Sequence, residues 1–292
     1  MENNRKYAIF TMDVEDFADA GCLALNGFSA DDDMLDGMDE YINLLEHHGI
    51  KATLFTLKST AVKIEEKLKE FADRGHSIAL HGLDHTPLHH LDREAFKNNI
   101  RKAKEYLESL IGKEVRGYRA PFFGMDNEKL TVLRELGFKY DSSSHDFTRN
   151  YLNGKFDIND FDKKCSGAFC KDGFFEFSLS CQNILGCSYP VSGGGYVRLC
   201  PWPIVRSGLK RYIKNNDMYV FYLHPFELSK NRSHDLKGVP AGDKHYLNGG
   251  IKQFGKKIEK IIEMLKKEDY TFTTFDELCD MIENKELSAE TV

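Results

Sequence analysis

Three carboxylates within four residues form the stretch of this chain that is best suited to chemistry. They lie in Asp13-Val14-Glu15-Asp16, which directly follows an apolar, strand-like run at residues 7–12. Carboxylates at the end of a buried strand are costly unless a positive charge, from a metal ion or an arginine, lies against them. Two later stretches can supply that charge, because one is rich in histidine and the other contains an arginine.

The histidine-rich stretch contains His81 and His85, four residues apart. Two imidazoles that point at one ion, together with a carboxylate, leave positions open for water and substrate, as a catalytic divalent metal site requires. The alternative interpretation is two unrelated surface histidines, because His76, His89 and His90 make the whole segment rich in this residue. The spacing alone leaves both interpretations open, and the acidic cluster favours the metal site.

Arg119 and His224 also follow predicted strands. Arg119 precedes Pro121 by two residues, and an arginine in this position can pair with a carboxylate and hold it ionised. A structural salt bridge is the alternative role for this arginine. His224 ends an apolar run at residues 218–223, where a single histidine is more often a buried structural residue. It becomes a candidate general acid only if it faces the same site.

The elements that must position these side chains can be read from hydrophobic periodicity. Strands are predicted at residues 7–12, 51–57, 76–80, 115–118, 138–140, 218–223 and 270–273, and helices at 34–48, 59–74, 93–111, 126–136, 203–214, 251–267 and after Thr274. Strands that alternate with helices indicate a parallel sheet. Functional groups at the carboxyl ends of several strands are typical of a (β/α) barrel, whose active site lies on that face.

Three segments depart from this alternation. Residues 17–33 are predicted to be a loop that closes over a site, and residues 229–250 a polar, glycine-containing loop. The helical period disappears between about 145 and 200, where glycine, cysteine, serine and aromatic residues dominate. We expect short antiparallel β-excursions or long loops over the mouth of the barrel there.

The composition excludes several classes of protein. The 292 residues are 41% hydrophobic and 29% charged, as in an ordinary globular protein. The net charge of −6 and the isoelectric point near 6.0 give no basic footprint for nucleic acid. No apolar run approaches the roughly 18 residues of a transmembrane segment. Residues 1–6 contain no apolar signal-peptide core, and the seven cysteines lack CxxC spacing. We therefore expect a cytoplasmic protein with free thiols.

Five motifs in order carry a resemblance to a known family. They are Asp13, His81-x-x-x-His85, Arg119-x-Pro121, Tyr140-Asp-Ser-Ser-Ser144 and Leu223-His224-Pro225. Together they resemble the polysaccharide deacetylases of carbohydrate esterase family four, over roughly residues 7–280. A subgroup with a DVED first motif is more similar still, since it also carries the stretches found here as Gly193-Gly-Gly-Tyr196-Val-Arg198 and His224-Pro-Phe-Glu227. That subgroup is associated with the biosynthesis of bacterial surface and exported polysaccharides.

The resemblance implies a fold and a set of roles. The fold would be an α/β, distorted (β/α)7 barrel that forms a single domain over residues 1–292, with its core at about 7–280. The activity would be a metal-dependent N-deacetylation, with zinc, cobalt or nickel as the ion. The roles carried over are Asp13 as general base, His81 and His85 as metal ligands, Arg119 as the partner of the base, His224 as the acid for the leaving amine, the N–H of Phe122 after Pro121 as an oxyanion donor, and Asp141 as a residue that orients His224.

One position departs from the commonest family pattern, in which the base is followed directly by a second aspartate that binds the metal. Val14 occupies that position here. Residues two apart on a strand share a face, so Glu15 would join Asp13 if the strand persists. Asp16 would be the ligand if the chain has already turned. Both acidic residues are therefore candidates for the metal site.

The expected substrate is an N-acylated amino sugar in a surface polysaccharide or its precursor. Aromatic residues could form stacking walls for the sugar, although most aromatics are simply core. The candidates for substrate contact are Pro121, Phe122, Phe123, Tyr196 and Trp202. Hydrolysis of another C–N bond, such as a cyclic amide, is the alternative on the same fold. A catalytically inactive carbohydrate-binding protein is the alternative from another functional class.

Overall fold

Strand β1 (Lys6–Val14) pairs with three other strands. It pairs in parallel with β11 (Met218–Leu223) along one edge, and with β2 (Ala52–Leu57) and β12 (Tyr270–Phe272) along the other. The computed structural model describes residues 5–24, 33–145, 156–184, 187–231 and 236–289. The first residues of the chain are thus joined to its last strands in one sheet.

The sheet continues outward from β1 in the order β11-β1-β2-β3-β4-β5-β8-β7-β6. Its remaining strands are β3 (Ser77–Gly82), β4 (Gly117–Tyr118), β5 (Tyr140–Asp141), β6 (Asp162–Cys165), β7 (Ala168–Lys171) and β8 (Phe174–Phe177). Strands β1 to β5, β8, β11 and β12 pair in parallel, whereas β7 pairs antiparallel with both β8 and β6. A separate antiparallel hairpin consists of β9 (Cys181–Ile184) and β10 (Cys187–Pro190).

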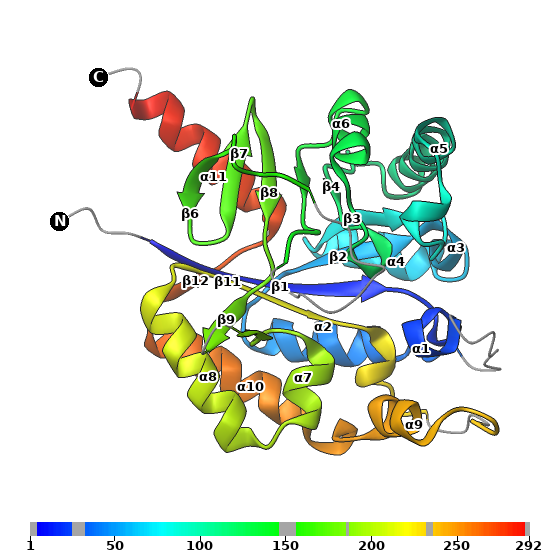
Figure 1. Cartoon of the computed structure of the whole chain (residues 1–292), viewed down its shortest axis with the longest axis vertical. Coiled ribbons are helices and arrows are strands. Elements are labelled where there is room, and N and C mark those ends of the chain that lie inside the picture. The colour runs from blue at the N-terminus through cyan, green and yellow to red at the C-terminus, as the bar shows by residue number, and fades with distance from the viewer. Residues whose placement is uncertain (1–4, 25–32, 146–155, 185–186, 232–235, 290–292) are drawn as a thin grey trace.

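Helices follow the strands and cover the sheet (Figure 1). In this view α2, α8 and α10 lie below β1, and α5 and α6 lie above it. The helices are α1 (Gly21–Ala24), α2 (Gly37–His47), α3 (Lys58–Ala61), α4 (Glu65–Asp73), α5 (Arg93–Ile111), α6 (Asn127–Glu135), α7 (Gly194–Leu199), α8 (Trp202–Asn215), α9 (Ala241–Asn248), α10 (Phe254–Lys267) and α11 (Phe275–Ala289). Among the described residues, no helix combines the length and apolarity that are needed to cross a bilayer.

The side chains of β1 alternate between two hydrophobic clusters. Phe10 and Val14 pack among the residues of the covering helices, whereas Tyr7 and Ile9 join a cluster inside the curve of the sheet. Asp13 shares the inner face with Tyr7 and Ile9, because residues two apart on a strand point the same way. Val14 points outward and is fully buried. This register explains why position 14 carries an apolar residue.

The predicted α/β architecture is confirmed, including the parallel strands that deliver polar residues at their carboxyl ends. Helix α5 has the predicted bounds, and the capping box after β12 forms, with the Thr274 N–H donating to Glu277 at 2.9 Å. The antiparallel excursions predicted between 145 and 200 are present as β6–β7–β8 and the β9–β10 hairpin.

Three local predictions were wrong. The helix expected over 59–74 is divided into α3 and α4, because Ile64 leaves the helical region with φ −133° and ψ 31°. Helix α7 begins in a run of glycines, which disfavour helices, so the sequence did not indicate it. Helix α9 lies inside the predicted polar loop 229–250 and is anchored by the buried Leu247. Of the loop predicted over 17–33, residues 25–32 lie outside the described part of the chain.

Candidate active site

Asp13 and Arg119 form a buried ion pair at the carboxyl ends of β1 and β4. Arg119 Nη1 donates to Asp13 Oδ1 at 2.7 Å and also to Thr11 Oγ1 at 2.8 Å. The Asp13 side chain is 3% exposed and that of Arg119 is 0% exposed. Because both charges are removed from water, each needs the other, and loss of either leaves a costly unpaired charge.

Arg119 is held in place from its other sides as well. Its Nε donates to the carbonyl of Ser142 at 3.0 Å, and its Nη2 donates to the hydroxyl of the same residue at 2.9 Å. The guanidinium carbon lies 4.1 Å from the ring centroid of Phe55, a cation–π distance. The arginine is therefore fixed before any ligand arrives, and it presents a fixed charge to Asp13.

Glu15 lies among three histidines. Its Oε2 is 2.8 Å from His85 Nε2 and 3.8 Å from His81 Nε2, and its Oε1 is 3.6 Å from His224 Nε2. The carboxylate and the first two imidazoles each offer one ligand atom, and these atoms lie within 4.8 Å of one another. Two neutral imidazoles and one carboxylate are a donor set used by catalytic divalent metals.

The polar atoms of this group fit a cation. Glu15 Oε2 is buried and accepts no well-aligned hydrogen bond from a described residue, which is costly for a carboxylate oxygen. His81 Nδ1 is bonded to the carbonyl of Arg119 at 2.8 Å, so its Nε2 faces Glu15. Such a backbone bond fixes both the tautomer and the direction of a metal-binding imidazole. A divalent ion would satisfy this oxygen, to which no described residue donates a well-aligned hydrogen bond.

The chain between the two histidines turns at Gly82. Its φ of +142° suits glycine, and a Cβ there would approach the carbonyl of Asp84 to 3.0 Å. The turn ends β3 directly after His81 and brings His85 back toward the same carboxylate. A strand end and a turn therefore bring His81 and His85 together, and these residues do not share the face of a helix.

Asp16 does not join this group. Its carboxylate pairs with Lys63, whose side chain is 50% exposed. Strand β1 ends at Val14, and the Glu15 N–H then donates to the carbonyl of Asp13 at 3.1 Å, which turns the chain. The turn keeps Glu15 with the histidines and sends the next side chain toward the surface. Of the two candidates for a metal carboxylate, the structure places only Glu15 beside the imidazoles.

His224 lies at the end of β11 and is in contact with Glu227. Glu227 Oε2 accepts the backbone N–H of His224 at 3.1 Å and lies 3.4 Å from its Nδ1. Its other oxygen accepts from Arg198 Nε at 3.1 Å, and both side chains of this ion pair are fully buried. A Cβ at Gly194 would lie 2.2 Å from Glu227 Oε2, so helix α7 can bring Arg198 this close only with glycine there.

The charges around His224 set its protonation. Burial alone would lower the pKa of His224, but the carboxylates of Glu15 and Glu227 raise it to about 9. Burial would likewise raise the pKa of Glu15, yet His85 and His224 outweigh it and hold that pKa well below its usual range. The arrangement favours an ionised Glu15 and an imidazolium at His224, which is the form that a general acid requires.

The expected role of Asp141 is not supported by the structure. Its carboxylate accepts the N–H of Ser143 at 3.1 Å and the hydroxyl of the same residue at 2.8 Å. Its neighbour across β5 and β8 is Glu176, with which it interacts directly. Burial raises the pKa of Asp141 to about 6 and raises that of Glu176 well above its usual range. The partner of His224 is Glu227, because the 3₁₀ turn Pro225–Glu227 returns that side chain to the histidine.

The predicted substrate-contact residues fall into two groups. Phe122 and Phe123 follow Pro121 in a 3₁₀ turn with φ of 54° and 56°, strained values for phenylalanine. The Phe122 ring lies 4.3 Å from that of His85 by centroid, so this turn borders the site. Tyr196 and Trp202 instead line two outer grooves that flank α8, and these two predictions are not supported by the structure.

Two residues of the site, Glu227 and Arg198, were not predicted from the sequence to have a role in it. Both lie in the family-like stretches 193–198 and 224–227. A glutamate three residues after a candidate acid, and an arginine beside three glycines, are the signals that could have indicated them. Asp19 also lies close enough to His85 and Glu15 to interact electrostatically, and burial raises its pKa.

Parts of the chain match known protein families. Residues 27–140 match the family model described as polysaccharide deacetylase, and residues 143–280 match a domain described as being of unknown function. A peptidoglycan deacetylase-like protein of Gibberella zeae is 32% identical over 136 residues, which is 44% of this chain and 40% of that protein. The chain thus spans well under half the length of that curated relative.

Solved structures show the same fold over a longer stretch. A Mycobacterium smegmatis protein assigned by inference to the polysaccharide deacetylases matches 98% of this chain and 93% of its own, with a TM-score of 0.63 and 16% identity. An allantoinase matches 96% of this chain and 91% of its own, with a TM-score of 0.59 and 14% identity. The first of the two matched sequence families ends within β5 and the second begins just after it, although one sheet runs through both. Over residues 27–140 the chain is similar to the polysaccharide deacetylase family, and over nearly its whole length it shares the fold of these solved structures.

Proposed function

We propose that the protein is a metal-dependent hydrolase that removes an N-acetyl, or another small acyl, group from an amino sugar. The observation that carries this proposal is the juxtaposition of two buried units. One is the Asp13–Arg119 ion pair, and the other is Glu15 with His81 and His85. The proposed base, Asp13, and the proposed metal ligand, Glu15, thus lie close to each other at the end of β1, and each has its own polar partners.

Different residues of the chain carry out different steps of amide hydrolysis. Glu15, His81 and His85 would hold a divalent ion, which when bound would act as a Lewis acid and lower the pKa of water. Asp13, kept charged by Arg119, takes a proton from the attacking water. His224 gives a proton to the amine as it leaves, which an amide needs because an amide anion is a poor leaving group. The N–H of Phe122 is the proposed donor to the oxyanion.

The proposed substrate is an acetylated amino sugar in a surface polysaccharide or in the precursor of one. The match to the polysaccharide deacetylase model and the relative that is named for peptidoglycan support this choice. Zinc is the ion we propose, because two imidazoles and a carboxylate suit it, with cobalt or nickel as substitutes. We also propose a reducing, cytoplasmic compartment, which is supported by the free thiols of Cys200 and Cys279.

The product assay tests the proposal directly. Zinc-loaded protein incubated with N-acetylglucosamine oligomers should release acetate and free amine in equal amounts, measured enzymatically and with an amine-reactive dye. Protein treated with a chelator should lose this activity and regain it when zinc is restored. Hydrolysis of a cyclic amide without acetate release would instead favour the allantoinase-like alternative. Release of neither product from a metal-loaded protein would favour the inactive, carbohydrate-binding alternative.

Glu227 offers a prediction about the leaving group. Glu227→Gln should lower the hydrolysis of the amide about 10- to 100-fold, because the variant no longer holds His224 with a full negative charge. Acetate esters of nitrophenol need no protonation of the leaving group, so their hydrolysis should change little. Kinetics on both substrates measure the difference. A loss that is equal for amide and ester, with an unaltered unfolding temperature, would contradict the assignment of Glu227 to His224.

A further inference from the structure

Helix α8 carries an unusual concentration of positive charge for this chain. Its fourteen residues, Trp202–Asn215, include Arg206, Lys210, Arg211 and Lys214 and no acidic residue, whereas the whole protein has a net charge of −6. All four basic side chains are exposed, and none forms an ion pair with a described residue. Their charge is therefore available to a partner outside the fold.

An apolar groove of about 640 Å3 borders one side of this helix. It is lined by Tyr189 of β10, Tyr196 of α7 and Ile204 of α8, which are 51%, 50% and 63% exposed. Large hydrophobic side chains with this exposure are rare in the described part of the chain, and three of the four gather here. Clustered exposure of this kind marks an interaction surface.

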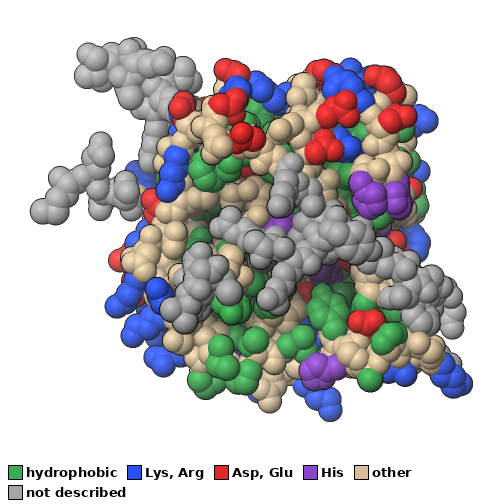
Figure 2. All heavy atoms as spheres, in the orientation of Figure 1, with side chains coloured by type: hydrophobic (Ala, Val, Ile, Leu, Met, Phe, Trp, Pro, Cys, Tyr) green, Lys and Arg blue, Asp and Glu red, His purple; other side chains and the backbone are tan. Residues whose placement is uncertain are grey.

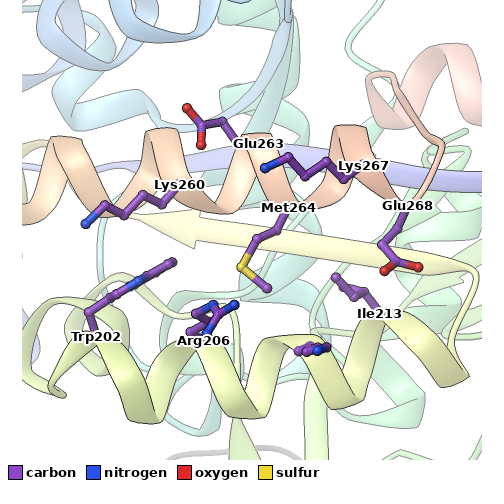
Figure 3. A pocket seen from close by; sticks show the side chains of 9 residues that line it. Trp202, Arg206, Ile213, Lys260, Glu263, Met264, Lys267 and Glu268 are labelled. Atoms are coloured by element: carbon purple, nitrogen blue, oxygen red, sulfur yellow. The ribbon is translucent and has the colours of Figure 1, made fainter.

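A second groove, of about 310 Å3, borders the other side of the helix, between α8 and α10. Figure 3 shows Trp202 and Arg206 of α8 facing Lys260 and Lys267 of α10 across it. The Lys260 ammonium lies 5.3 Å from the centroid of the Trp202 ring, a cation–π distance. Glu263 and Glu268 offset part of the charge, so this groove remains positive overall.

The spacing along α8 explains how one helix serves both grooves. Positions 203, 204, 205, 207, 208 and 211 line the apolar groove, and 202, 206, 210 and 213 line the basic one. Residues three and four apart share a helix face, so one face of α8 borders the apolar groove and another face borders the basic groove. Figure 2 shows Lys and Arg side chains along the lower left edge, over α8, beside a group of hydrophobic side chains.

We propose that this surface, formed by α8 with Tyr189 and Tyr196, docks the protein onto an anionic lipid bilayer. Basic side chains beside exposed aromatic and aliphatic ones are typical of helices that lie in the membrane interface. The lysines and arginines meet the anionic headgroups, and Ile204 and the two tyrosines enter the boundary of the acyl chains. A polyanion without an apolar phase would use the charges but would leave these hydrophobic side chains in water.

The docking surface is joined to the candidate active site through helix α7. Tyr196 lies in the apolar groove, and Arg198, two residues later, pairs with Glu227 beneath His224. A protein docked in this way would hold its site close to substrates that are themselves attached to a bilayer. The docking proposal does not depend on the proposed reaction, because binding to vesicles can be measured without any turnover.

Vesicle sedimentation with the full chain tests the proposal. The protein should bind vesicles that contain phosphatidylglycerol and phosphatidylcholine at low salt, and it should not bind vesicles of phosphatidylcholine alone. Each basic residue near such a surface contributes about fivefold to the binding constant. The double variant Lys210→Gln/Arg211→Gln should therefore bind about 25-fold more weakly. Ile204→Ser should also weaken binding, although it changes no charge.

A matched control uses Arg101 and Lys102, an exposed basic pair on α5. Arg101→Gln/Lys102→Gln removes the same charge from another helix and should leave vesicle binding unchanged. Equal losses from both double variants would show that only net charge matters, and would overturn the proposal. Wild-type protein that does not bind anionic vesicles would overturn it as well, as would binding to a soluble polyanion such as heparin that is stronger than binding to the vesicles.

Discussion

Asp13→Asn should nearly abolish deacetylation and leave metal binding intact. Asparagine has almost the same shape and can still accept a hydrogen bond from Arg119 Nη1, but it cannot take a proton from water. General bases contribute about 10²- to 10⁴-fold, so kcat should fall by at least about 100-fold. The measurement is steady-state kinetics on an N-acetylated sugar oligomer, together with zinc titration by calorimetry. The zinc affinity should change little, because Asp13 bonds to the arginine and lies outside the group of Glu15, His81 and His85.

The fold of this variant needs a separate check, because its partner is buried. Removing the charge of Asp13 leaves the Arg119 guanidinium without its counter-ion in a fully buried position. Breaking a buried ion pair costs about 3–5 kcal/mol when one partner is lost, so the unfolding temperature is measured alongside. A folded, zinc-binding Asp13→Asn protein that keeps its activity would contradict the assignment of the base.

Glu15→Ala should abolish high-affinity zinc binding, and activity with it. Among the described residues, Glu15 supplies the one carboxylate that lies within ligand distance of both His81 and His85, and the alanine removes it. Isothermal titration of the chelator-treated protein measures this loss, which we expect to exceed about 100-fold because one of three protein ligands has gone. Circular dichroism before titration shows whether the variant is folded.

Asp16→Ala is the matched control for Glu15. It removes a carboxylate from the neighbouring position, but this one pairs with the half-exposed Lys63. A surface pair contributes at most about 1 kcal/mol to stability, so both zinc affinity and turnover should stay close to those of the unmodified protein. The opposite pattern, with zinc lost from Asp16→Ala and kept by Glu15→Ala, would show that the chain turns differently after β1.

Much of the site could be predicted because parallel strands fix the positions of the residues at their carboxyl ends. Asp13, His81, Arg119 and His224 each follow an apolar run, and the parallel strands bring these ends to one side of the sheet. The alternation of β1 also accounts for Val14, because a residue next to Asp13 faces the helices. Expectations based on strand direction and on the period of two were therefore reliable.

The residues that were missed depend on contacts between distant segments. Glu227 reaches His224 through a 3₁₀ turn, and Arg198 reaches Glu227 from a short helix that begins with glycines. Neither hydrophobic periodicity nor helix propensity reports such a contact. The expectation that Asp141 would orient His224 was wrong for the same reason. Asp141 interacts with Glu176 because β5 pairs with β8, a strand that comes much later in the chain.

Trp202 shows why an aromatic residue in the sequence only weakly predicts a substrate-binding surface. The sequence places it just before a helix and close to the glycine-rich stretch, which is compatible with a position at the site. In the structure it begins α8 and faces α10 across the basic groove, with its ring against the Lys260 ammonium. Its position was decided by the packing of two helices, which the residue type alone does not indicate.

Anomalous diffraction from crystals grown with zinc tests the central claim most directly. The claim is that Asp13 and Glu15 have separate tasks, one as a base paired with Arg119 and the other as a metal ligand. We predict one anomalous peak that is coordinated by Glu15, His81 and His85, with Asp13 still bonded to Arg119. A peak coordinated by Asp16, or the absence of any peak at these three residues in zinc-saturated crystals, would contradict the claim.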